Sequence, residues 1–123
     1  MKLTQLQPIL YVPDVRQTID WYVTNLFFTE KNYNEELGWG VVKKDDVLVM
    51  LSKPNDHIPF SGSHFTGSFY INIDDVIALW ELLKDKPFVY YKLETFEYGM
   101  REFAIKDCNG YIIQFGQDMI SGL

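Results

Sequence analysis

The chain has 123 residues, of which 47% are hydrophobic and 23% are charged. This length and balance are typical of one folded domain and exclude a two-domain enzyme and a disordered chain. Eleven Lys and Arg residues against 17 Asp and Glu residues give a formal net charge of −6, which disfavours nucleic acid as a partner and favours a cationic one.

The aromatic and cysteine content narrows the class of protein further. The chain has 3 Trp, 8 Tyr and 9 Phe residues, more than a small core needs, so we expect some of them to line a binding site. Cys108 is the only cysteine, so neither an internal disulfide nor a Cys-based zinc site is expected. No apolar run approaches the roughly 18 residues of a membrane span. We therefore expect a cytoplasmic protein with no membrane partner.

The first half of the chain predicts one helix and four strands. Residues Leu6–Val12 are mostly apolar and end at Pro13, as in a strand. Asp14 is placed to cap a helix that runs to Asn25 or Leu26. The apolar stripe of this helix consists of Val15, Ile19, Tyr22, Val23 and Leu26. The three further strands are expected at Phe28–Asn32, Trp39–Lys43 and Val47–Leu51.

The second half repeats this pattern after a linker at residues 53–67, which is rich in Pro, Gly and Ser. A strand is expected at Ser68–Ile73, and Asp74 or Asp75 then caps a second helix that ends before Pro87. The apolar stripe of this helix consists of Val76, Leu79, Trp80 and Leu83. The last three strands are expected at Phe88–Leu93, Met100–Lys106 and Tyr111–Phe115.

The two halves therefore share the order βαβββ, over residues 1–52 and 68–117, with a period of about 60 residues. Such a period is too long for a solenoid repeat and fits the duplication of one supersecondary module. We expect a single α+β domain in which two tandem βαβββ modules form curved half-sheets around a cleft. The helices are expected on the outer faces.

Strand alternation assigns side chains to the two faces of the second half-sheet. If the apolar residues of the strand at 68–73 face the helix, Ser68, Tyr70 and Asn72 face the cleft. The same reasoning turns Glu102 and Gln114 toward the cleft. This mixture of aromatic, amide and acidic side chains indicates a binding surface, without a nucleophile beside a base.

Several other polar and aromatic residues are of types that occur in functional sites. His57 and His64 are seven residues apart, a spacing that fits no local metal motif, so we interpret them as solvated loop residues. The acidic pairs Glu35-Glu36 and Asp45-Asp46 are interpreted as solvated residues near strand ends. Trp39 lies between two glycines without large neighbours, which leaves both a core role and a cleft or interface role open.

Several stretches of the chain resemble a known family. Residues 98–107, followed by 109–111 and 114–116, resemble the last two strands of bleomycin-resistance proteins. Residues 10–15 are similar to the first strand of that family, and its glycine after the first helix is replaced here by Phe27. These proteins belong to the glyoxalase, bleomycin-resistance and extradiol dioxygenase superfamily, also called vicinal oxygen chelate proteins.

The resemblance implies a paired βαβββ fold and, in the drug-binding branch, a homodimer that exchanges strands or modules. The metal enzymes of the superfamily carry ligands on the first and last strands of each half, and these positions correspond here to Gln7, Met50, Ser68 and Gln114. None of these residues is His or a carboxylate, and a thioether and a hydroxyl are poor ligands for divalent cations. We therefore expect no metal and no cofactor.

The expected function is that of a metal-independent small-molecule binding protein, a homodimer that sequesters a cationic, partly aromatic, antibiotic-like ligand. The residues expected to bind it are Trp39, Tyr70, Tyr98, Glu102 and Gln114. The aromatic rings would stack on the ligand and Glu102 would hold its charge. One alternative is a superfamily lyase, isomerase or dioxygenase with a non-standard metal site that includes Gln7 and Gln114. Another is a structural or regulatory domain with a different ligand.

Overall fold

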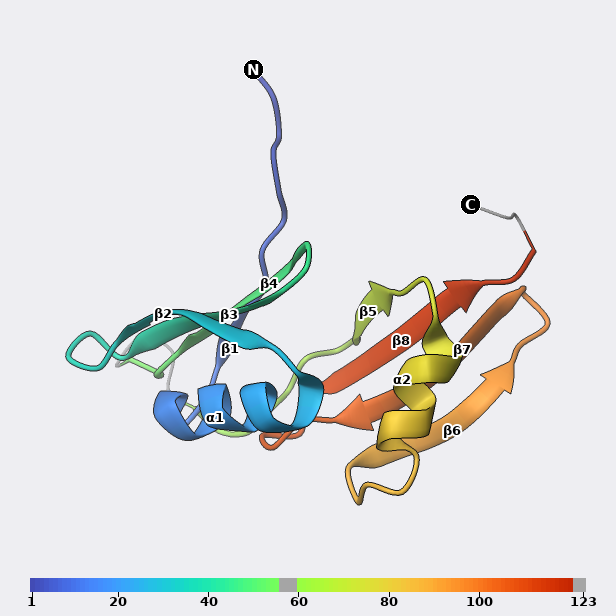
Figure 1. The fold of residues 1–123 in the computed structure, drawn as a ribbon. Coiled ribbons are helices and arrows are strands. Elements are labelled where there is room, and N and C mark those ends of the chain that lie inside the picture. The colour runs from blue at the N-terminus through green and yellow to red at the C-terminus, as the bar shows by residue number, and fades with distance from the viewer. Residues whose placement is uncertain (56–59, 121–123) are drawn as a thin grey trace. The chain divides into compact units, whose positions relative to one another are not determined.

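The computed structural model describes residues 1–55 and 60–120, and it divides into two compact units, residues 1–63 and 64–123. Each unit has one helix and four strands in the order βαβββ, as expected from the sequence (Figure 1). The division between the units lies inside the stretch 53–67 that the composition predicts as a linker. We describe the two units separately.

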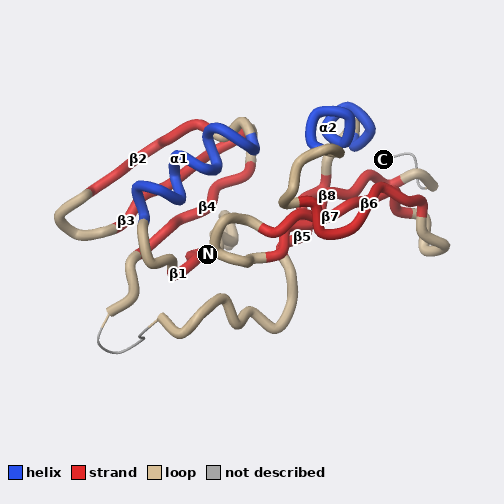
Figure 2. Tube along the Cα trace, turned by 90° about the horizontal axis from the view of Figure 1, so that it is seen from below, coloured by secondary structure: helices blue, strands red, loops and turns tan. Residues whose placement is uncertain are grey.

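The first unit is a four-stranded sheet with one helix against it. Its elements are β1 (Ile9–Tyr11), α1 (Val15–Leu26), β2 (Thr29–Asn34), β3 (Trp39–Lys44) and β4 (Val47–Ser52). The strand order is β1-β4-β3-β2, in which β1 runs parallel to β4 and the other pairs are antiparallel. In this register Val41 pairs with Met50, and Trp39 pairs with Ser52. Helix α1 packs on β2, β3 and β4 (Figure 2).

Local chemistry explains where α1 begins and what it buries. The Asp14 carboxylate accepts a hydrogen bond from the Gln17 backbone N–H at 2.9 Å, which confirms Asp14 as the N-cap. The expected stripe is wrong at one position, because Val23 is 39% exposed while Thr18 is buried in its place. Thr18 tolerates burial because its hydroxyl donates to the Asp14 backbone carbonyl at 2.8 Å.

The second unit repeats the arrangement of the first. Its elements are β5 (Phe69–Asn72), α2 (Val76–Leu83), β6 (Val89–Thr95), β7 (Met100–Lys106) and β8 (Ile112–Asp118). The strand order is β5-β8-β7-β6, with β5 parallel to β8. Asp75 caps α2 by accepting from the Ala78 N–H. The core on the helix side is aromatic, because the Phe103 ring lies 5.1 Å from Trp80 and 5.4 Å from Phe115.

The boundaries of every strand except β7 differ from those expected by one to three residues, and β1 and β8 differ most. The first strand is shorter than Leu6–Val12, because the chain before Pro8 extends away from the sheet with Leu6 95% exposed. Helix α2 ends at Leu83, before Pro87 as expected. Strand β8 continues to Asp118, beyond the expected end at Phe115. Within the described residues, no helix has the length and apolar character needed to cross a bilayer.

The C-cap of α1 offers a test of local strain. Phe27 has a φ of 64° and its side chain is 44% exposed. A residue with a Cβ atom is disfavoured in this left-handed conformation by about 1 kcal/mol, and glycine is not. We expect Phe27→Gly to raise the free energy of unfolding by up to about 1 kcal/mol in urea denaturation. Phe27→Ala keeps the Cβ atom and is the matched control, expected to give no gain. Equal losses in both variants would contradict this prediction.

Candidate functional site

The face of the second sheet opposite α2 has a buried carboxylate at its centre. On β7, Phe103 and Ile105 are fully buried, and Glu102 points to the other face yet is only 1% exposed. Glu102 pairs with Gly116 of β8, so no side chain of β8 stands opposite it. Tyr70 of β5 occupies this space, since a Cβ atom on Gly116 would lie 1.9 Å from the Tyr70 hydroxyl oxygen. The missing side chain at Gly116 therefore lets Tyr70 reach across β8 to Glu102.

Four donors share the two oxygens of Glu102. Tyr98 and Tyr70 donate to Oε1, the latter at 3.3 Å. Tyr91 donates to Oε2, and Gln114 Nε2 donates to the same oxygen at 3.0 Å. Gln114 Nε2 also lies 2.8 Å from the Tyr91 hydroxyl oxygen, to which it donates. Because a carboxylate has about four lone-pair sites, the protein's own donors occupy them.

Ser68 completes this network, because its hydroxyl donates to the amide oxygen of Gln114. Four of the six residues lie on the four strands of the second sheet, Tyr98 lies in the turn between β6 and β7, and Ser68 directly precedes β5. We call them the Glu102 cluster: Ser68, Tyr70, Tyr91, Tyr98, Glu102 and Gln114. In the described part of the chain, every buried side-chain nitrogen and oxygen has a hydrogen-bond partner.

The cluster keeps its tyrosines in the neutral form. The hydrogen bond to Glu102 raises the pKa of Tyr98 to about 12, with burial as a second cause. Burial, followed by the charge of Glu102, raises the pKa of Tyr70 to about 12. Burial also raises the pKa of Tyr91 above its ordinary value. All three phenols are therefore hydrogen-bond donors to Glu102 near neutral pH.

A cavity of about 500 Å³ opens beside the Glu102 cluster, a volume within the range of small-molecule sites. Its lining consists of Tyr91, Lys92, Glu94, Phe96, Tyr98, Glu102 and Gln114. The rings of Phe96 and Tyr98 are stacked, with centroids 5.4 Å apart and planes within 2°. The Tyr91 ring stands at 88° to Phe96. Because Tyr98 is 62% exposed, its ring is accessible to a ligand.

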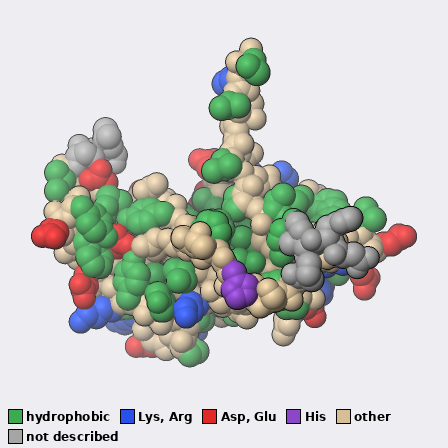
Figure 3. Space-filling model, turned by 180° about the vertical axis from the view of Figure 1, so that it is seen from behind, with side chains coloured by type: hydrophobic (Ala, Val, Ile, Leu, Met, Phe, Trp, Pro, Cys, Tyr) green, Lys and Arg blue, Asp and Glu red, His purple; other side chains and the backbone are tan. Residues whose placement is uncertain are grey.

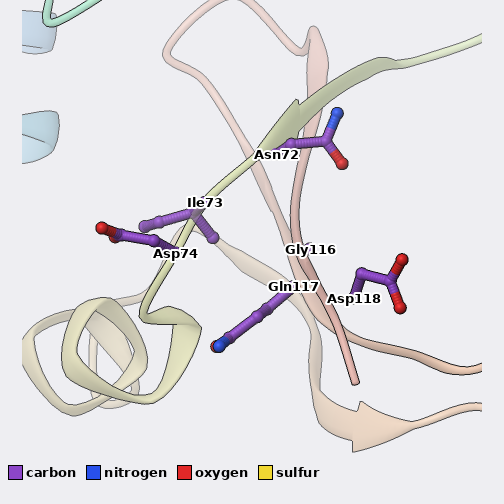
Figure 4. Close-up of a pocket in the computed structure, with 6 residues that line it drawn as sticks. All are labelled: Asn72, Ile73, Asp74, Gly116, Gln117 and Asp118. Carbon is purple, nitrogen blue, oxygen red and sulfur yellow. The ribbon is translucent and has the colours of Figure 1, made fainter. Parts of the chain in front are cut away.

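A second cavity of about 420 Å³ lies near the ends of β5 and β8 (Figure 4). Gln117 points toward α2, where its amide oxygen accepts from the Val76 N–H at 3.0 Å. Asn72 and Asp118 extend on the other side of the strands. The contact of Gln117 with α2 is a capping interaction, so this part of the cavity has a structural role.

The structure brings together four of the five residues expected to bind a ligand. Tyr70, Tyr98, Glu102 and Gln114 belong to one hydrogen-bonded cluster. Trp39 does not belong to it, because it lies half-buried on β3 of the first unit. That these residues bind a ligand stays a prediction.

Four residues of the cavity lining were not predicted from the sequence, namely Tyr91, Lys92, Glu94 and Phe96. Tyr91 lies on β6, where register shifts on both sides of it interrupt the regular alternation. Phe96 follows the end of β6 and lines the cavity. The one signal in the sequence was the density of aromatic residues between positions 88 and 98.

The positions that correspond to metal ligands do not fit a divalent cation. Ser68 and Gln114 are hydrogen-bonded to each other, and Gln7 and Met50 lie in the first unit. Hydroxyl, thioether and neutral amide groups lack the charge or imidazole donors that such a site uses. Among residues 1–55 and 60–120, no group of three or more His, Cys, Asp or Glu side chains could hold a metal ion. His57 lies outside the described residues, and His64 is exposed.

Comparisons with known proteins agree with the architecture. Residues 3–115 match the family model described as the Glyoxalase/Bleomycin resistance protein/Dioxygenase superfamily. Comparison with curated protein sequences finds no significant match. Among solved structures, TioX from Micromonospora sp. ML1 is 16% identical, with a TM-score of 0.76 over 94% of this chain and 98% of TioX.

Two further solved structures have different printed functions. A lactoylglutathione lyase from Agrobacterium tumefaciens is 17% identical, with a TM-score of 0.73 over 98% of this chain and 97% of the lyase. A bleomycin resistance determinant encoded on transposon Tn5 is also 17% identical, with a TM-score of 0.74 over 96% of this chain and 100% of the determinant. At these identities the likeness establishes the fold, and the function depends on the site.

The raised pKa values predict how the tyrosines titrate. Because the pKa of Tyr70 and of Tyr98 is raised to about 12 from 10, the neutral phenols favour the folded state. This stabilisation is complete below pH 10 and is lost as the pH rises through about 12. Glu102→Gln removes the carboxylate charge, so we expect the pKa of Tyr98 to fall toward 10. Ultraviolet absorbance of tyrosinate measures this titration, with Tyr98→Phe to assign the step. Identical curves for the wild type and Glu102→Gln would contradict the prediction.

Proposed function

Since this chain belongs to the glyoxalase/bleomycin resistance protein/dioxygenase superfamily, we propose that it is a metal-independent protein that binds and sequesters a cationic, partly aromatic small molecule. The observation that carries the proposal is the buried Glu102 carboxylate beside a cavity lined by Tyr91, Phe96 and Tyr98. The rings offer stacking surfaces and the carboxylate supplies the negative potential that a cation requires.

The charge balance around Glu102 supports a cationic ligand. Among the described residues, none of the ion pairs involves Glu102, and its donors are all neutral phenol or amide groups. Neutral donors stabilise a buried carboxylate without cancelling its charge. The other two charged residues of the cavity lining, Lys92 and Glu94, have opposite signs, so the lining as a whole carries the negative charge of Glu102. The net charge of −6 for the whole chain adds to the attraction of a cation from solution.

The solved structures of the same fold include a drug-resistance protein and an enzyme. The Tn5 determinant is named for resistance to bleomycin, a large cationic compound with planar aromatic rings, and it shares the fold of this chain. The lyase shares that fold as well. The Glu102 cluster favours binding over catalysis, because Ser68 donates to the Gln114 amide and not to a base that could activate it.

Titration with bleomycin tests the proposal. We expect calorimetry to detect saturable binding that weakens as the salt concentration rises. Tyr98→Ala should weaken binding by about three- to tenfold because it removes a stacking surface. Glu102→Gln should weaken it mainly at low salt, where the lost charge matters most.

Tyr90→Ala is the matched control for the aromatic variant. Tyr90 is an exposed tyrosine of the same sheet that does not line the cavity, so binding should be unchanged. Trp39→Ala belongs in the same titration, because a stacking role for Trp39 is also proposed. No heat and no change in Trp fluorescence at high micromolar bleomycin would exclude this ligand class.

The homodimer expected for the drug-binding branch is also part of the proposal. Several large apolar side chains are exposed, among them Leu3, Leu6, Ile77 and Leu82, and hydrophobic side chains are spread over the surface in Figure 3. Burial of such side chains is what a permanent interface provides. We expect light scattering in dilute solution to give twice the chain mass of 14.5 kDa. A mass of 14.5 kDa that persists at high micromolar protein would contradict the dimer.

A further inference from the structure

We propose that the cavity beside the Glu102 cluster recognises an ammonium group whose nitrogen carries methyl or other alkyl substituents, in preference to a primary amine. This inference rests on the proposed function and specifies the chemistry of the cation. It follows from which surfaces of the cluster are already occupied and which are left to a ligand.

The carboxylate itself is closed to direct hydrogen bonding. Glu102 is 1% exposed, and both of its oxygens accept two hydrogen bonds from the protein. A primary amine or guanidinium would need to displace a tyrosine or Gln114 to form an ion pair with it. Displacement would break a hydrogen bond to the buried carboxylate, so part of the gain from the new ion pair would be lost.

The rings, in contrast, are available to a cation. Tyr91, Phe96 and Tyr98 all line the cavity, and the hydroxyls of both tyrosines donate to Glu102. Hydrogen bonding to an anion shifts electron density toward the phenol, so it makes the ring more attractive to positive charge. The negative charge of Glu102 therefore attracts a cation by way of the tyrosine rings and without a direct hydrogen bond.

A quaternary ammonium fits such a surface better than a primary one. It has no N–H groups that need acceptors, and its charge is spread over alkyl groups that pack on aromatic faces. A primary ammonium is compact and strongly hydrated, so placing it on the rings removes favourable hydration. The carboxylate of Glu94 also lines the cavity, but it is exposed to water, so an ion pair with it adds little. The free-energy cost of desolvation in this cavity is therefore smaller for the alkylated ammonium than for the primary ammonium.

The same unit contains a smaller example of this interaction. The Lys106 ammonium nitrogen lies 4.7 Å from the centroid of the Tyr90 ring. Both groups are exposed, so this lysine keeps most of its hydration. Tyr90 thus differs from Tyr98 in having a cation of the protein already placed on its ring.

The decisive experiment compares benzyltrimethylammonium with benzylammonium, which differ only in the methyl groups on nitrogen. We expect calorimetry or saturation-transfer NMR to show about five- to tenfold tighter binding of the trimethylated probe. Benzyl alcohol is the neutral control and should bind more weakly than the trimethylated probe. Equal or tighter binding of benzylammonium or of benzyl alcohol would overturn the inference.

Three variants locate the site. Phe96→Leu should weaken binding of benzyltrimethylammonium at least fivefold, because it removes an aromatic wall of the cavity. Tyr98→Phe keeps the ring and removes only the hydroxyl, so we expect a smaller loss of affinity than in Phe96→Leu. This conservative change also disturbs the folded structure less. Tyr90→Leu removes an exposed ring of β6 that does not line the cavity, and it should have no effect. Circular dichroism verifies that each variant is folded, and equal effects of Phe96→Leu and Tyr90→Leu would overturn the assignment.

The bleomycin titration separates failure of this inference from failure of the proposed function. If bleomycin binds and benzyltrimethylammonium has no advantage over benzylammonium, the inference fails and the proposed function stands. If neither bleomycin nor either benzyl cation binds, both fail together.

Discussion

The burial of the Glu102 carboxylate is the constraint that organises the second unit. A carboxylate removed from water needs hydrogen-bond donors or a cation to replace its hydration. Here the donors come from β5, β6, β8 and the turn between β6 and β7, and all converge on one side chain of β7. One carboxylate therefore links the side chains of this polar face, as a metal ion links the residues that bind it.

The backbone had to accommodate this convergence. Gly116 leaves the space through which Tyr70 crosses β8, and any larger residue there would displace the Tyr70 hydroxyl. On the other side of β7, the pairing of β6 shifts register once before Tyr91 and once after it. Such bulges redirect side chains relative to a regular strand. A glycine on one neighbouring strand and a bulge on the other thus allow two tyrosines to approach one carboxylate from opposite sides.

Much of this architecture could be predicted from local patterns. Asp14 and Asp75 precede apolar stripes and do cap the two helices, and all ten elements occur in the expected order. Alternation in β5, β7 and β8 placed Tyr70, Glu102 and Gln114 on a common face, because these strands are regular where those residues lie. The family model confirms the resemblance to the superfamily.

What could not be predicted depended on irregular or distant structure. Tyr91 was not predicted because a bulge interrupts the alternation of side chains between the two faces of β6. No residue type in β6 marks where this bulge lies. The exposure of Val23 could not be read from helical spacing, since the width of the buried stripe is set by the sheet that α1 packs against. For Trp39 the local sequence left both a core role and a cleft or interface role open, since its glycine neighbours do not show what the ring packs against. The structure places it half-buried on β3 of the first unit, outside the Glu102 cluster.

The strand registers make the two modules directly comparable. Glu102 stands opposite Gly116, two positions along β7 from the Ala104–Gln114 pair. Trp39 stands opposite Ser52, two positions along β3 from the Val41–Met50 pair. If Gln114 and Met50 are equivalent, as their place on the last strand of each module indicates, Trp39 occupies in the first module the position that Glu102 occupies in the second. The two modules thus carry an indole and a carboxylate at equivalent strand positions. The repeated backbone keeps the same strand pairing in both modules, while the polarity of the side chain at this position differs between them.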